Sequence, residues 1–386
     1  MFIRSIKLNN FLSFGDKAEA IQLSSLNVVI GANGTGKSNL LEAIDLLRNA
    51  PNELTKPIRE GGGVTDWLWK GGENIPAATI DAIIEKPERN LRYLLSFTAV
   101  GQRFEIVDER IENEQPDAHQ SEPYFYYRFN RGRPYLNIKS DKRSLNNEDI
   151  DKERSILAQR RDPDQYPEIT DIAKEFSRIK LYREWCFGRY TTPRMPQKAD
   201  LPNEFLESDA SNLGLVLNRI DNKYPSAKRR ILEALNVLYD GIDGYSVSVE
   251  GGTVQVFFQE RGYSIPATRL SDGTLRYLCL LAILCHPAPP PLICIEEPEL
   301  GLHPDVLPTI AELLKEASTR CQLIVTTHSD VLVDAMTDQP ESVFICEKDE
   351  SGTTLRNLSS DELKPWLERY RLGELWTRGE LGGTRW

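Results

Sequence analysis

The stretch "GANGTGKS", from Gly31 to Ser38, constrains the fold of this chain more than any other segment. It follows an apolar, strand-like run, "LNVVI", and it opens a segment with helical spacing, "KSNLLEAIDLL". The pattern G-x-x-x-x-G-K-[ST] between a strand and a helix is typical of a phosphate-binding loop. Its glycines let successive backbone N–H groups face phosphate, and the helix N-terminus adds positive potential. We therefore predict an α/β P-loop protein that binds a nucleotide.

The residues of this loop have distinct expected roles. Lys37 should reach the β- and γ-phosphates, and the Ser38 hydroxyl should bind Mg²⁺. ATP and Mg²⁺ are thus the expected cofactors. The predicted nucleotide contacts in the loop are Asn33, Gly34, Thr35, Gly36, Lys37, Ser38 and Asn39.

A pair of carboxylates ends a second apolar strand, in "PLICIEEPELGLHP". Side chains alternate in direction along a strand, so Glu296 and Glu297 cannot do the same work. We expect Glu296 to hold Mg²⁺ and Glu297 to polarise the water that attacks the γ-phosphate.

Two further segments carry candidate site residues. His328 stands at the end of the strand-like run in "QLIVTTHSDVLVDAM", where it would contact the γ-phosphate, although a lone histidine at a strand end is more often structural. In "ATRLSDGTLRYLCLLAIL" the residues Ser271 to Thr274 open an apolar helix and leave N–H groups free for an anion. An ordinary helix cap fits that local sequence equally well.

Composition limits the class of protein and its partners. The chain has 386 residues and a net charge of −11, which argues against coating nucleic acid through overall charge. "RFNRGRPYLNIKSDKR", from Arg128 to Arg143, is a local basic segment, although a solvated hairpin explains it as well. No apolar run approaches a membrane span, and the six cysteines form no C-x-x-C pair. We expect a cytoplasmic protein with reduced thiols and no membrane partner.

The pattern of predicted elements indicates one domain with several parts. Strand-like segments dominate the middle of the first half, helical ones follow, and the last third alternates helix and strand. We expect a nucleotide-binding core from residues 1–50 and 240–350, a β-rich lobe at 77–140, a helical lobe at 150–237 and a C-terminal tail at 351–386.

Taken together, these motifs resemble the ABC-type ATPases of the RecF, structural-maintenance-of-chromosomes (SMC) and overcoming-lysogenization-defect branch. "EEPELGLHP", "TTHSDVLVD" and the ending "LGELWTRGELGGTRW" resemble the bacterial stand-alone predicted AAA-family ATPases of that branch. The matching segments are Gly31 to Ser38 (Walker A), Leu270 to Thr274 (signature), Leu292 to Glu297 (Walker B), Glu299 to Pro304 (D-loop region) and His328 (switch histidine).

The resemblance implies an ABC head, with a mixed core sheet, an antiparallel β lobe and an inserted helical lobe. In such heads the signature helix caps ATP held by a second chain. Ser271 and Gly273 would thus complete the site of a partner in a two-fold homodimer, which could assemble into higher oligomers.

The resemblance also implies a glutamine that links the helical lobe to the metal. Gln159 is the candidate, with Gln102 and Gln165 as alternatives. Two departures from the family pattern stand out. Glu296 replaces the usual Asp, and the signature lacks the second Gly and the Gln of "LSGGQ".

Several functions remain open at this point. ATP-driven dimerisation could gate a DNA-directed or anti-phage defence activity through a separate effector such as a nuclease or toxin, with slow hydrolysis. The long stretch between Ser38 and Ser271 has no heptad run for a coiled-coil arm, and the residues after His328 are too few for a fused Toprim nuclease. A RecF-like DNA repair ATPase and an ATP-locked scaffold are the alternatives, while the degenerate signature disfavours a transporter subunit.

Overall fold

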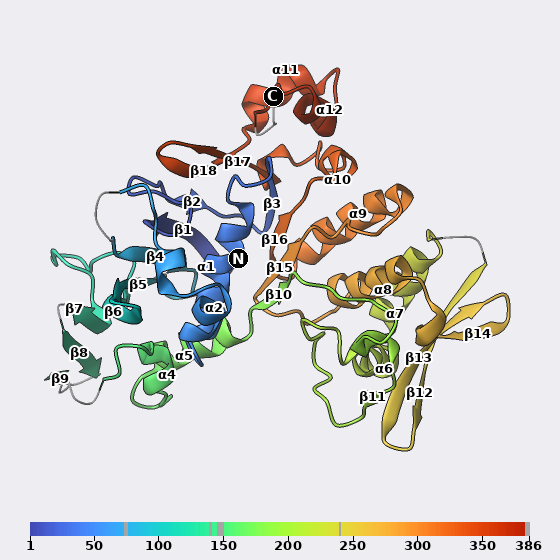
Figure 1. The fold of residues 1–386 in the computed structure, drawn as a ribbon, viewed down its shortest axis with the longest axis horizontal. Coiled ribbons are helices and arrows are strands. Elements are labelled where there is room, and N and C mark those ends of the chain that lie inside the picture. The colour runs from blue at the N-terminus through green and yellow to red at the C-terminus, as the bar shows by residue number, and fades with distance from the viewer. Residues whose placement is uncertain (73–75, 131, 139–140, 145–149, 239–240, 383–386) are drawn as a thin grey trace.

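The computed structural model describes residues 1–72, 76–130, 132–138, 141–144, 150–238 and 241–382. A 6-stranded sheet lies at its centre, with the β lobe on one side and the helical lobe on the other (Figure 1). All its neighbouring pairs are parallel except the last. In sheet order the strands are β10 (Lys180–Tyr182), β15 (Leu292–Glu296), β16 (Gln322–Thr326), β3 (Leu26–Ile30), β17 (Val343–Asp349) and β18 (Gly352–Asn357).

The central sheet is covered on both faces, as expected for short apolar parallel strands. Val28 and Ile30 of β3 face one hydrophobic core, and Val29 between them faces the other. Helices α1 (Lys37–Asn49) and α5 (Pro167–Ser177) pack into the core that contains Val29. Helices α8 (Asp272–Leu284) and α9 (Leu307–Ser318) pack into the opposite core. The predicted α/β P-loop fold is confirmed.

The β lobe is an 8-stranded antiparallel sheet. It starts earlier in the chain than residue 77, because the first two strands join it. In sheet order its strands are β2 (Ile21–Gln22), β1 (Ile3–Asn9), β4 (Ala78–Ile84), β5 (Leu91–Val100), β6 (Arg103–Asn113), β7 (Phe125–Asn130), β8 (Arg133–Ile138) and β9 (Asp141–Ser144). Three short helices flank strands β4 to β9 in the chain. They are α2 (Thr55–Glu60) and α3 (Val64–Trp67) before β4, and α4 (Ile156–Gln159) after β9.

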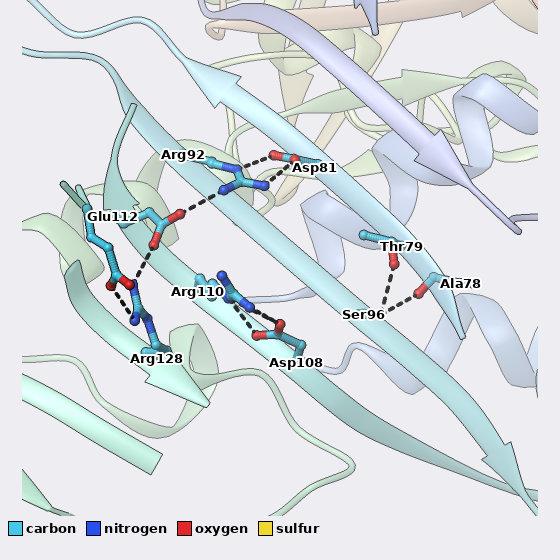
Figure 2. Close-up of polar contacts among 10 residues, drawn as sticks. Ala78, Thr79, Asp81, Arg92, Ser96, Asp108, Arg110, Glu112 and Arg128 are labelled. Carbon is cyan, nitrogen blue, oxygen red and sulfur yellow. Dashed lines mark hydrogen bonds and ion pairs between the residues drawn. The ribbon is translucent and has the colours of Figure 1, made fainter. Parts of the chain in front are cut away.

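Ion pairs cross several strands of the β lobe. Figure 2 shows Arg92 between Asp81 and Glu112, and Arg128 on the other oxygen of Glu112. Arg128 lies 3.2 Å from Glu122 as well. The first arginine of the basic segment is therefore paired with carboxylates, whereas part of that segment lies outside the described residues.

The helical lobe combines helices with a 4-stranded sheet. Its elements are α6 (Leu213–Lys223), α7 (Pro225–Leu235), β11 (Gln197–Lys198), β12 (Ile242–Glu250), β13 (Thr253–Glu260) and β14 (Tyr263–Pro266). One difference from the expected helical pattern matters for the site. Strand β10 follows α5 directly in "SRIKLYREW" and joins the central sheet, where Leu181 and Tyr182 are buried.

The C-terminal segment packs against the helix that follows His328. Helix α12 (Leu372–Thr377) contacts α10 (Asp330–Asp334), and the Glu374 backbone N–H donates to Asp334 Oδ1 at 3.2 Å. A Cβ at Gly373 would clash with the Asp330 carbonyl, so glycine permits this close approach. Helix α11 (Ser360–Leu367) precedes α12. No helix in the described part of the chain has the length and apolar character of a membrane span.

Candidate nucleotide-binding and catalytic site

Three predicted site segments meet at one edge of the central sheet. Strands β3, β15 and β16 are adjacent and parallel, with Glu296 opposite Thr326 and Thr326 opposite Val29. The Walker A loop follows β3, the carboxylate pair ends β15, and His328 follows β16. The carboxyl edge of a parallel sheet is where ligands of α/β proteins bind.

In the Walker A loop, glycines adopt the left-handed conformations that form the turn, and Lys37 is buried. Gly36 has φ 110°, and a Cβ there would meet the Ser13 and Thr353 hydroxyl oxygens. The Lys37 ammonium donates to the carbonyls of Gly31 at 2.8 Å and Ala32 at 3.0 Å. Burial lowers the pKa of Lys37, while nearby acidic groups oppose that shift.

The proposed metal ligands touch each other. Ser38 Oγ donates to Glu296 Oε1 at 2.5 Å, across 258 positions of sequence. A hydroxyl and a carboxylate at a P-loop are hard oxygen donors, the set that Mg²⁺ prefers. The longer side chain of Glu296, compared with Asp, still reaches Ser38. These residues fit Mg²⁺, and Ser38 and Glu296 would hold it.

An arginine that sequence reasoning missed completes this cluster. Arg183 Nε donates to Glu296 Oε2 at 2.9 Å, and its Nη1 donates to Glu42 Oε1 at 2.7 Å. Tyr182 pairs with Ile295, so Arg183, the residue directly after β10, arrives beside Glu296. Burial opposes the charge of Arg183, but its bonds to Glu296 and Glu42 outweigh burial and raise its pKa.

The structure places Gln159 away from this cluster. Its side-chain amide donates to the carbonyls of Asp151 at 2.9 Å and Arg154 at 2.6 Å, and its Oε1 accepts from the Asp151 N–H at 2.9 Å. Gln159 therefore braces its own loop beside the β lobe. Gln102 and Gln165 are exposed, and no described hydrogen bond joins either to Ser38 or Glu296. The residue that reaches Glu296 ahead of the helical lobe is Arg183.

The second carboxylate of the pair faces His328, the histidine expected to act as the switch residue. Glu297 Oε1 lies 3.6 Å from His328 Nε2, whereas Glu296 faces Ser38. Glu297 has φ 47°, an unfavourable conformation for a residue with a Cβ. Backbone strain of this kind concentrates at functional sites. The different directions of the two carboxylates agree with the different roles predicted for them.

Glu299, in the D-loop region, positions the loop that carries His328. Its Oε1 accepts from Thr327 Oγ1 and from the His328 N–H, both at 2.7 Å. Oε2 is buried without a described partner, and burial raises the pKa of this carboxyl. The contact joins two strand ends that are distant in sequence, so no local pattern reveals it.

The signature residues lie apart from the Walker A loop of their own chain. Helices α8 and α1 cover opposite faces of the central sheet (Figure 1). Ser271 is exposed and caps α8, accepting from the Thr274 N–H at 3.1 Å. Gly273 has a role within the chain, since a Cβ there would lie 2.5 Å from the Gly301 carbonyl oxygen.

A buried arginine contacts the residues on either side of Ser271. Arg194 is 4% exposed and donates to the carbonyls of Phe187, Ala267 and Leu270. It also pairs with Asp272 in the first turn of α8. The end of the helix that carries Ser271 is thus fixed in the monomer, while the Ser271 side chain remains at the surface.

Similar solved structures share this fold. The head domain of an Smc protein bound to the C-terminal winged-helix domain of ScpA aligns with a TM-score of 0.60 and 17% identity, covering 94% of this chain and 99% of that one. An Smc head from Pyrococcus furiosus, with an extended coiled coil and bound to the C-terminal domain of ScpA, gives 0.58 and 14%, covering 95% and 98%.

Similarity to curated sequences is local. Chromosome partition protein Smc of Clostridium kluyveri is 34% identical over 71 residues, and that of Fusobacterium nucleatum is 32% identical over 112 residues. These matches span 18% and 28% of this chain but only 6% and 9% of the relatives.

A family model covers most of the chain. The model described as "AAA domain, putative AbiEii toxin, Type IV TA system" matches residues 26–334, from β3 to the end of α10. All the motifs at the sheet edge and the signature fall within that range. The structure and this match confirm the resemblance to ABC-type ATPases of the SMC, RecF and overcoming-lysogenization-defect branch, and the chain belongs to this AAA family.

Proposed function

We propose that this chain is a slow ATPase whose ATP-driven homodimerisation gates a separate effector in a DNA-directed or anti-phage defence system. One observation carries the ATPase proposal: Ser38 and Glu296 are in contact at the sheet edge where Glu297 faces His328. Lys37 would bind the phosphates, Glu297 would accept the proton of the attacking water, and His328 would contact the γ-phosphate. Mg²⁺ held by Ser38 and Glu296 would neutralise phosphate charge.

The exposed signature supports the homodimer. Ser271 is at the surface and fixed from behind by the contact of Arg194 with Asp272. The Ser271 hydroxyl, held by its bond to the Thr274 N–H, and the N-terminus of a 13-residue helix suit the γ-phosphate of ATP in a second chain. Because the same two surfaces would meet twice, the pair should close with two-fold symmetry.

The family description supports a two-component system, because it names a toxin of a toxin–antitoxin system. A direct DNA-repair role has support from the local similarity to chromosome partition proteins. The ion pairs of the β lobe favour the effector proposal, since Arg92 and Arg128 are engaged by carboxylates rather than turned toward a nucleic-acid phosphate.

The first experiment is a pull-down of the Glu297→Gln protein, trapped with ATP and Mg²⁺, from its native cells. We expect a homodimer with a stoichiometric nuclease or toxin, identified by mass spectrometry and by the mass of the complex. The Lys37→Ala protein is the control, because it should lose nucleotide binding and so recover neither dimer nor effector.

Other outcomes decide between the alternatives. A bare dimer that carries DNA would replace the effector proposal with a RecF-like repair role. If Glu297→Gln changes neither assembly nor phenotype, the chain is an ATP-locked scaffold and hydrolysis is not the working step.

A further inference from the structure

We propose that Arg183 is a built-in counter-charge that competes with Mg²⁺ for Glu296 and thereby sets the Mg²⁺ concentration at which the site holds nucleotide. This inference rests on the proposed ATPase function and deepens it by adding a control on the same site.

The first step is that both carboxylate oxygens of Glu296 already have hydrogen-bond donors. Its two carboxylate oxygens have different partners: Ser38 Oγ is 2.5 Å from Oε1, and Arg183 Nε is 2.9 Å from Oε2. A cation held by Ser38 and Glu296 would therefore share its carboxylate with a guanidinium. Because like charges repel and guanidinium stays charged in proteins, Arg183 weakens the site for a divalent cation.

The second step is that Glu42 holds the guanidinium in this place. Glu42 lies one helical turn beyond Ser38 on α1, and its Oε1 accepts from Arg183 at 2.7 Å. The side chains of Arg183, Glu42 and Glu296 are 25%, 25% and 19% exposed, so solvent screens these charges only partly. Arg183 bridges two carboxylates, as a cation would at this position.

The third step is an alternative place for the guanidinium. A cavity of about 470 Å³ opens beside it between α1, α2 and the end of β10. Carboxylates dominate its walls, and they include Glu42, Asp45, Glu60, Glu184 and Asp209. An arginine that leaves Glu296 could keep its contact with Glu42 and gain a second carboxylate there. Such a move would free Glu296 for the metal at the cost of the bond between Arg183 and Glu296.

The test compares Mg²⁺ dependence of nucleotide binding without turnover. A fluorescent, non-hydrolysable ATP analogue is titrated at fixed concentration against Mg²⁺, using the full chain and its variants. We expect Arg183→Gln and Arg183→Met to lower the half-saturating Mg²⁺ concentration by about fivefold or more. Arg183→Lys keeps the charge and should stay closer to the parent protein.

Arg48→Gln is the matched control. Arg48 lines the same cavity but pairs with Asp45 at 2.6 Å, so its loss removes a positive charge without touching Glu296. Its half-saturating Mg²⁺ concentration should match that of the parent. Thermal unfolding of each variant verifies that it is folded.

A higher or unchanged Mg²⁺ requirement in both neutral variants would overturn the inference and make Arg183 only a positioning residue for Glu296. Failure of the proposed function has a different signature, because the parent protein would then bind no nucleotide at any Mg²⁺ concentration.

Discussion

The two halves of the proposed ATP site are built in different ways. In the Walker half, Glu296 contacts both Ser38 and Arg183. The three residues come from segments that are distant in the sequence. The signature half is exposed in front and supported from behind, with Ser271 at the surface and Arg194 buried beneath it. One half has its partners in the monomer, whereas the other has a fixed shape and an open face. This difference is expected if the second half works on another copy of the chain.

Ser271→Arg offers the strongest test of this contrast. The bulky charge should block a partner's ATP from the signature while leaving the chain's own Walker loop intact. We expect the loss of ATP-dependent dimers by light scattering and a fall in ATP turnover of about 100-fold or more, with nucleotide binding retained. Val249→Arg, exposed on β12, is the control. If Ser271→Arg still dimerises with ATP, the signature does not act across an interface.

Arg194→Met should show how much the buried arginine contributes to the stability of the segment that carries the signature. The change leaves the Phe187 and Ala267 carbonyls and the Asp272 carboxylate without their cation. We expect the free energy of unfolding in urea to fall by about 3 kcal/mol, because buried carbonyls lose their donor, whereas the largely exposed Asp272 carboxylate can be solvated. Arg189→Met, on an exposed neighbour, should change it little. Equal losses in both variants would show that Arg194 does not anchor the signature.

The buried carboxyl of Glu109 in the β lobe should make the stability of the protein depend on pH. This buried carboxyl of β6 accepts from Tyr93, Ser155 and the Ile156 N–H, and burial raises its pKa to about 7. The folded protein then keeps a proton that the unfolded chain releases, so this contribution to stability is complete below about pH 4.5 and is lost as pH rises through 7. Over that window the loss should reach at most about 3 kcal/mol.

Glu109→Gln should flatten that pH dependence, as measured by urea unfolding between pH 5 and pH 8. Glu105→Gln, on the same strand and partly exposed, should keep the slope of the parent protein. An unchanged slope in Glu109→Gln would assign the pH dependence to other groups.

Gly273→Ala should have the smallest effect of these changes, and it tests the signature half alone. The new methyl would lie 2.5 Å from the Gly301 carbonyl oxygen within the same chain. We expect a loss of about 1–3 kcal/mol in monomer stability without nucleotide, because backbone must shift to accept it. An unchanged monomer with weaker ATP-dependent dimers would mean that Gly273 serves only the partner's site.

Sequence predicted the parts of the site whose residues are neighbours in the chain. The Walker loop lies between an apolar strand and a helix, and Glu296 and Glu297 end an apolar strand, so local patterns were sufficient. Arg183 was missed because β10 has three residues, too few for a periodicity, and its place in the sheet depends on β15. Glu299 was assigned to the D-loop region, but its contacts with Thr327 and His328 were not predicted because these partners lie at the end of another strand.

The expected linking glutamine shows the limit of a resemblance. Gln159 was chosen for its position at the start of the helical segment, but its side chain bonds to Asp151 and Arg154. The contact to Glu296 comes from Arg183, directly after a short strand, and uses a cation instead of an amide. At this position the side chain pairs with two carboxylates of this chain, Glu296 and Glu42, which the family pattern alone does not specify.

The order of strands in the central sheet also bears on how the protein is made. Strand β3 is synthesised long before its two neighbours in the sheet, β16 and β17, which come roughly three hundred residues later. Until then an apolar strand and its phosphate loop lack both hydrogen-bonding partners. Ribosome-bound chains should therefore expose β3 while the residues up to β16 are made, and this strand is then a candidate segment for chaperone binding.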